Sequence, residues 1–125
     1  MPRKKAKDTV ELLSEAVVEA LLDKKAKDPV LLDFRKLDSS LCDSFIICHG
    51  TSHTQVEALA EGVIRDVKKK TGLNPYHREG FENAEWILID YFDVIVHIFE
   101  DSKRSFYNLE QLWADAEITR IKVKE

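Results

Sequence analysis

Residues 85–100 read EWILIDYFDVIVHIFE, and this stretch most constrains what the chain can fold into. Apolar side chains recur at every second position in both halves, which is typical of strands with one buried face. Only Tyr91 and Phe92 separate the two halves, so we expect an antiparallel β-hairpin with a turn of two residues. The sequence therefore predicts a β-sheet that includes this hairpin.

The two faces of the hairpin differ in chemistry. One face carries a complete hydrophobic set and is expected to face the core: Ile87, Ile89, Val94, Val96 and Ile98. On the other, open face the expected register gives three pairs: Trp86 with His97, Leu88 with Ile95, and Asp90 with Asp93. Opposed carboxylates repel by roughly 0.2–1 kcal/mol, so an arginine, a metal ion or a basic partner should compensate them. Alternatively, each Asp only accepts hydrogen bonds from backbone N–H groups of the turn.

Capping residues predict the helices. Asp8 and Ser52 each precede a Glu or Gln by three residues, which is the capping-box pattern of a helix start. Gly72 is expected to end the second helix, because glycine readily adopts the left-handed conformation found there. Ser102 can cap a final helix.

Further strands are expected at residues 30–35 and 44–50, and residues 73–81 form a loop or a short edge strand. The fold class is therefore α/β (α+β), with a mixed β-sheet of about five strands flanked by helices. We divide the chain into a basic, flexible N-terminus at residues 1–8, a single domain at 9–116 and a loose C-terminal tail at 117–125.

Composition limits the classes of function. A net charge of −4 argues against a general nucleic-acid binder, which usually carries a basic face. No apolar run approaches the ~20 residues of a transmembrane helix, and no apolar segment follows the basic start. Cys42 and Cys48 do not make a disulfide framework, so we expect a reducing cytoplasm.

Support for a chemical site is weak. The histidines and cysteines match no metal-ligand spacing, and a metal-dependent hydrolase built on His97 and the aspartates is a minor alternative. Gly50, Thr51 and Ser52 lie between a strand and a helix start, where phosphate groups bind. This arrangement resembles the nucleotidyltransferase fold, although the D-x-D or D-x-E pair of those enzymes is missing from the next strand. The alternative function is a small nucleotidyltransferase that binds phosphate at Gly50–Ser52.

Longer stretches resemble one known family. They read LLDFRKLDSSLCDSFIICHGTS, QVEALAEGVIRDVKK, EGFENAEWILIDYFDVIVHIF and YNLEQLW. Over about residues 9–115 the chain is similar to the ribosomal silencing factor, or Iojap, family. Phe92 stands where the family usually has glycine, and Thr54 where it usually has arginine. Because bulky residues rarely adopt positive φ, Phe92 disfavours the tight two-residue turn.

The resemblance implies a translational repressor that is not an enzyme and uses no cofactor. Family members bind protein fourteen of the large ribosomal subunit and prevent subunit joining by steric occlusion. Their fold is similar to that of nucleotidyltransferases, and isolated members form homodimers; any contact with ribosomal RNA is expected to be secondary. The residues expected to bind the partner are Trp86 as the anchor, Asp90 and Asp93 as charge partners, His97 as an orienting group, and Arg104, Tyr107 and Glu110 on the final helix. Trp113 is expected to lie mostly in the core.

Overall fold

The computed structural model describes residues 2–37 and 42–123, and of residues 2–8 it describes the backbone alone. The helices are α1 (Pro2–Asp23), α2 (His53–Thr71), α3 (Asp101–Tyr107) and α4 (Leu109–Leu112). The strands are β1 (Lys27–Asp33), β2 (Ser44–Gly50), β3 (His77–Glu79), β4 (Trp86–Asp90), β5 (Val94–Glu100) and β6 (Glu117–Arg120).

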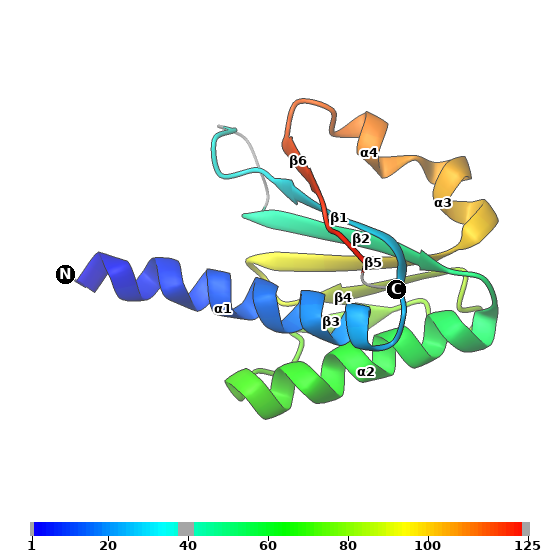
Figure 1. Cartoon of the computed structure of the whole chain (residues 1–125), viewed down its shortest axis with the longest axis horizontal. Helices are drawn as coiled ribbons and strands as arrows, with labels where there is room; N and C mark the ends of the chain where they lie inside the picture. Colours follow the sequence, from blue (N-terminus) through cyan, green and yellow to red (C-terminus); the bar gives the residue numbers. More distant parts are fainter. Residues whose placement is uncertain (1, 38–41, 124–125) are drawn as a thin grey trace.

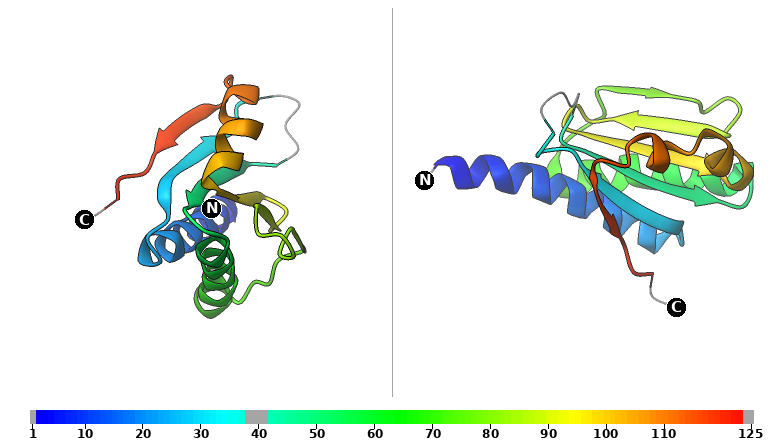
Figure 2. Two further views of the ribbon diagram at one scale, coloured as in Figure 1. Left: turned by 90° about the vertical axis from the view of Figure 1, so that its right-hand side faces the viewer. Right: turned by 90° about the horizontal axis from the view of Figure 1, so that it is seen from above.

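The strands form one mixed sheet of six, in the order β3-β4-β5-β2-β1-β6. β2 and β5 are parallel, and the other neighbouring strands are antiparallel. α1 and α2 lie side by side below the sheet in Figure 1, and α3 and α4 lie on its other side (Figure 2). The expected mixed sheet flanked by helices is confirmed, with β6 as an additional strand.

The β4–β5 hairpin keeps the expected faces but not the expected register. Trp86 pairs with Phe99, so each residue of β4 pairs two positions later in β5 than expected. The expected pairing of Asp90 with Asp93 is therefore wrong. The turn is wider than expected because Asp93 bonds the segment at the start of β2 and not Asp90. The Asp93 carbonyl oxygen accepts a hydrogen bond from the Asp43 N–H at 2.9 Å. A shift of two residues leaves every side chain on its original face, since side chains alternate with a period of two.

Two hydrophobic clusters lie on opposite faces of the sheet. The face predicted to be the core side packs against α1 and α2, and its hairpin residues are fully buried: Ile87, Ile89, Val94, Val96 and Ile98. The other face carries a second cluster in which Phe99 and Ile47 are fully buried and Leu109 and Trp113 pack against them. The expectation that this face is open is therefore wrong over β5 and β2, and Trp113 does pack on the core.

The helix α2 begins and ends as the sequence predicts. Ser52 is its N-cap, and the Ser52 Oγ accepts a hydrogen bond from the Gln55 N–H at 3.1 Å. Gly72 ends the helix with φ of 80°, and its N–H donates to the carbonyl oxygen of Lys68 at 2.9 Å. Both caps satisfy backbone groups that the helix itself leaves unpaired.

Both ends of the chain differ from expectation. α1 begins at Pro2, so Asp8 lies inside the helix and does not cap it, and residues 2–8 continue the helix. A proline at the first helical position followed by Arg, Lys and Ala favours this early start. At the other end, residues 117–120 form β6 and are not a loose tail. β6 pairs with β1 because the outer edge of β1 would otherwise leave backbone groups unpaired.

The expected final helix is interrupted at Asn108. This residue has φ of 48°, a left-handed conformation that ends α3 and separates it from α4. Ser102 is not the cap, because Glu100 holds that position and the Ser102 Oγ instead donates to the Glu100 side chain at 2.6 Å. On the two sides of the break, Phe106 is 75% exposed and Leu109 is buried.

Candidate functional site

The strand β4 presents an aromatic and acidic surface beside α3. Trp86, Leu88 and Asp90 alternate on the sheet face opposite α1 and α2, and all three are partly exposed. α3 contacts β5 and β2 and contributes Tyr107, which is 45% exposed. We call the surface formed by Trp86, Leu88, Asp90 and Tyr107 the β4 face.

Trp86 is held in place by its neighbours. Its ring stacks on Phe99 with centroids 5.1 Å apart, and it contacts Tyr107 at 4.7 Å. The indole Nε1–H donates a hydrogen bond to the Nδ1 of His97 at 3.1 Å. Because these contacts fix the ring before any partner arrives, little side-chain entropy is left to lose on binding.

His97 lies on the predicted face but beneath its surface. It is only 4% exposed, and burial lowers its pKa to about 4. The ring is therefore neutral at pH 7, and because Nδ1 accepts from Trp86, the proton is on Nε2. Nε2 has no hydrogen-bond partner among the described residues. His97 thus contacts Trp86 from below and orients it, while the neighbouring ring of Phe45 lies 4.4 Å away.

The aspartates of the hairpin lie near each other without forming the expected opposed pair. Asp90 pairs across the sheet with Ile95, and its Oδ1 accepts a hydrogen bond from the Phe92 N–H at 2.7 Å. Asp90 therefore makes the bond to the turn backbone that the sequence allowed for. Asp93 lies beside Asp43, whose pKa is raised by burial and then by the negative charge of Asp93.

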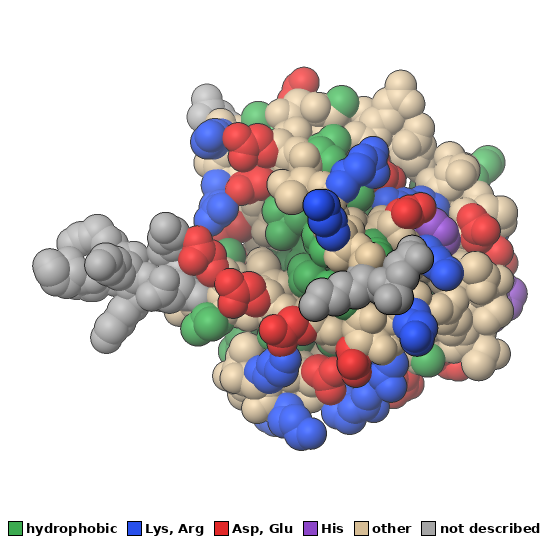
Figure 3. Space-filling view, viewed as in Figure 1, with side chains coloured by type: hydrophobic (Ala, Val, Ile, Leu, Met, Phe, Trp, Pro, Cys, Tyr) green, Lys and Arg blue, Asp and Glu red, His purple; other side chains and the backbone are tan. Residues whose placement is uncertain are grey.

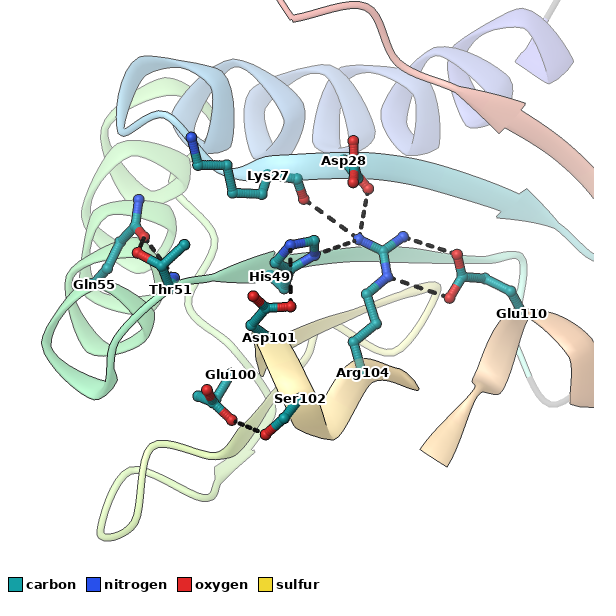
Figure 4. Close-up of polar contacts among 10 residues, drawn as sticks. All are labelled: Lys27, Asp28, His49, Thr51, Gln55, Glu100, Asp101, Ser102, Arg104 and Glu110. Atoms are coloured by element: carbon teal, nitrogen blue, oxygen red, sulfur yellow. Dashed lines mark hydrogen bonds and ion pairs between the residues drawn. The ribbon is translucent and has the colours of Figure 1, made fainter. Parts of the chain in front are cut away.

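Arg104 and Glu110 do not belong to the β4 face. The Arg104 side chain is largely buried, and its Nε and Nη2 donate to the two carboxylate oxygens of Glu110 at 3.3 and 2.8 Å. Its Nη1 donates to the Asp28 carbonyl oxygen at 2.8 Å and contacts the His49 Nδ1 at 2.9 Å (Figure 4). Burial, and then the charge of Arg104, lowers the pKa of His49. This cluster ties α3 and α4 to β1 and β2.

The predicted phosphate site is occupied by a side chain of the protein itself. The Thr51 N–H and Oγ both donate to the Gln55 Oε1, at 2.8 and 3.2 Å (Figure 4). Gln55 also lies close to Gly50, where an added Cβ would be only 3.1 Å from the same oxygen. Two donors available to a phosphate, the N–H and the hydroxyl of Thr51, are therefore already bonded to Gln55. In the described part of the chain, no three Asp, Glu, His or Cys side chains are grouped to hold a metal ion.

Sequence reasoning missed two side chains next to the predicted residues. Tyr76 and Phe92 are exposed at the β4–β5 turn, with ring centroids 6.0 Å apart. The departure of Phe92 from the family pattern was the available signal. Tyr76 lies in a loop with no periodic pattern, so only the three-dimensional structure places it beside Phe92.

Fold and site together define an α+β domain with a partly covered sheet face that presents a fixed indole and nearby carboxylates. Among residues 2–37 and 42–123, none of the helices is both long and apolar enough for a membrane crossing.

The chain belongs to the ribosomal silencing factor family. A family model described as "Ribosomal silencing factor during starvation" matches residues 6–125. The chain is 43% identical over 104 residues to the ribosomal silencing factor RsfS of Halalkalibacterium halodurans, covering 83% of this chain and 87% of that protein. A crystal structure of a protein from Chromobacterium violaceum is similar, with a TM-score of 0.76 and 40% identity over 82% of this chain and 83% of that one. A mouse protein named "Mitochondrial assembly of ribosomal large subunit protein 1" is 30% identical over 73 residues, covering 57% of this chain and 32% of that protein.

Proposed function

We propose that this chain represses translation by docking on the large ribosomal subunit, at its protein fourteen, and so preventing the small subunit from joining. Membership of the silencing-factor family supports a role at the ribosome. The name of the mouse relative, which refers to the large subunit, supports that subunit as the partner. No catalysis is needed for such a role, because a bound protein of this size can block an interface by its volume alone.

The observation that carries the proposal is the fixed indole of Trp86 on the β4 face. Tryptophan is the side chain most enriched at binding hot spots, and this one is held by Phe99, Tyr107 and His97 while part of it stays exposed. Asp90 adds a carboxylate on the same face. Ribosomal proteins are commonly basic, so an acidic and aromatic face is complementary to them.

Sedimentation with isolated large subunits tests the docking. Trp86→Ala is expected to weaken binding at least about 30-fold, the effect of losing a hot-spot side chain. Leu12→Ala is the matched control, because Leu12 is 57% exposed on α1, on the other side of the sheet. Thermal unfolding confirms that both variants are folded. If Trp86→Ala and the wild type sediment equally with large subunits, the β4 face is excluded as the docking surface.

A light-scattering assay of subunit joining tests the repression itself. Wild-type protein that is bound to large subunits should prevent the rise in scattering when small subunits are added. Trp86→Ala should allow joining at the same protein concentration. Joining at the normal rate on large subunits saturated with the wild type would contradict steric occlusion.

The nucleotidyltransferase alternative is addressed by calorimetry. Thr51 and Gln55 bond each other, so we expect no heat from ATP or CTP with magnesium at micromolar sensitivity. Measurable nucleotide binding that Thr51→Val abolishes would revive the enzymatic hypothesis.

We further propose a cytoplasmic location and a homodimer of the isolated protein, both as family properties. A surface suited to the homodimer lies beside β6, where a groove of about 390 Å³ is lined by Val18, Leu31 and Ile121. Figure 3 shows hydrophobic side chains exposed in this region, between the acidic side chains of α1 and the basic ones near β6. Analytical ultracentrifugation of the wild type and of Ile121→Asp tests this surface. A wild type that is monomeric at tens of micromolar would exclude the homodimer.

A further inference from the structure

Two exposed aromatic rings lie side by side at the β4–β5 turn. Tyr76 is 78% exposed and Phe92 is 70% exposed. Their ring centroids are 6.0 Å apart, with an angle of 61° between the ring planes. An aromatic side chain buries on the order of 150–250 Å² when it is covered, so this pair is a surface that a partner can cover.

The backbone at Phe92 is held in a conformation that its side chain disfavours. Its φ is 81°, in the left-handed region, where a bulky residue is a real outlier and glycine is favoured. The Asp90 Oδ1 accepts from the Phe92 N–H at 2.7 Å, and the Tyr91 N–H donates to the Val94 carbonyl oxygen at 2.9 Å. Among the described residues, Tyr76 provides the one aromatic ring contact of Phe92. Packing within the chain therefore gives no reason for a phenyl ring at this position, and a role in binding does.

Three carboxylates surround the turn. Asp90 bonds the Phe92 backbone, and Asp93 and Asp43 are joined through the backbone bond between them. Their negative charges all act on the thiol of Cys42, which places them around the same end of the sheet. Among the described residues, the Asp93 carboxylate makes no hydrogen bond or ion pair. A cation brought by a partner would be attracted both by these charges and by the faces of the two rings.

We propose that Tyr76 and Phe92, with Asp90, Asp93 and Asp43, form a contact that receives an arginine side chain of the docking partner. We call these residues the turn contact. Arginine fits better than lysine because its planar guanidinium can stack on a ring while it donates to a carboxylate. The chain itself places a guanidinium over a ring, with the Arg78 guanidinium 5.3 Å from the ring centroid of Phe81.

The turn contact extends the β4 face at the end away from α3. Trp86 begins β4 and Asp90 ends it, so the two lie about 13 Å apart at ~3.3 Å per residue. α3 follows β5 at the right-hand end of the sheet in Figure 1, opposite the turn. A single partner can therefore contact the indole and the turn together. The identity of the partner at this extended surface rests on the proposed function. The preference for arginine can be tested without a ribosome.

The first experiment uses a blocked Arg-Arg dipeptide and its citrulline analogue, which has the same shape without the charge. Amide chemical shifts of the labelled full-length protein are followed by NMR during titration with each peptide. The arginine peptide should shift the amides of Tyr76, Phe92 and Asp93 in a saturable way, with the citrulline peptide at least about fivefold weaker. Phe92→Gly should lose most of this response while its own stability is unchanged or higher, because glycine adopts the observed φ freely.

Two outcomes would overturn the turn contact. One is an equal response of Phe92→Gly and the wild type to the arginine peptide. The other is an equal response of the amides near exposed carboxylates of α1, such as Glu15 and Glu19. Either result would mean that arginine is attracted by net negative charge alone.

The second experiment measures binding of the same variants to large ribosomal subunits. Phe92→Gly and Tyr76→Ala should each weaken binding by about fivefold, the effect of losing one cation–π contact. Leu12→Ala, which removes exposed apolar surface elsewhere, should bind as the wild type does. Binding that depends on Trp86 but not on Phe92 would exclude the turn contact from the docking and leave the proposed function intact. Absence of wild-type binding would refute the proposed function, while the peptide titration still decides the arginine chemistry.

Discussion

The Trp86 indole donates its Nε1–H to the Nδ1 of His97 at 3.1 Å, which joins a partly exposed side chain on β4 to a buried one on β5. The two residues are diagonal neighbours, since Trp86 pairs with Phe99 and His97 with Leu88. The bond requires a neutral His97 with its proton on Nε2. The orientation of the proposed docking anchor therefore depends on the protonation of a buried ring.

Protonation of His97 should destabilise the fold as the pH falls. The pKa of His97 is about 4 in the folded protein and about 6.5 in the unfolded chain, so the unfolded state binds a proton first. The stabilisation is complete above pH 6.5 and is lost as the pH falls toward 4, with about 2 kcal/mol lost by pH 5. Urea unfolding at pH 7.5 and pH 5 measures this change.

His97→Gln provides the control for that experiment. Gln can still accept the indole hydrogen bond but does not titrate, so the variant should lose less stability between the two pH values. Some dependence should remain, because the pKa of His49 is lowered as well and shifts stability in the same direction. An unchanged pH dependence in His97→Gln would show that His97 is not the titrating group.

Arg104 should matter for stability and not directly for docking. Arg104→Met leaves the Glu110 carboxylate without its bidentate partner in a largely buried position, which should cost about 3 kcal/mol in the free energy of unfolding. Asp33→Asn is the comparison, because it breaks the more exposed pair with Arg35 and should cost at most about 1 kcal/mol. Urea unfolding measures both. A stable Arg104→Met that fails to bind large subunits would restore Arg104 as a contact residue.

The faces of the β4–β5 hairpin could be predicted from the sequence because side-chain alternation survives a register shift of two residues. The register itself could not, since the width of the turn depends on the bond between Asp93 and Asp43, which belongs to another part of the sheet. The caps of α2 were predictable because capping is local in sequence. Ser52 and Gly72 act on backbone groups only a few residues away.

The structure brings together only some of the residues predicted to bind the partner, and the others are separated by contacts between distant segments. Trp86 and Tyr107 do lie together at the surface. Arg104 was placed on the same surface because it shares α3 with Tyr107, yet its partners come from β1, β2 and α4. A sequence pattern describes one helix at a time, so it could not show which side of α3 those strands cover.

Asp90 should contribute separately to the turn and to docking, and two substitutions distinguish these contributions. Asp90→Ala removes the acceptor of the Phe92 N–H and should destabilise the protein by about 1 kcal/mol. Asp90→Asn keeps an acceptor at that position and should retain most of the stability. Both variants lose the negative charge, so both should bind large subunits more weakly and with less dependence on salt. Urea unfolding and sedimentation at two salt concentrations measure the two effects. If Asp90→Asn were to bind like the wild type while Asp90→Ala did not, the role of Asp90 would be limited to holding the turn.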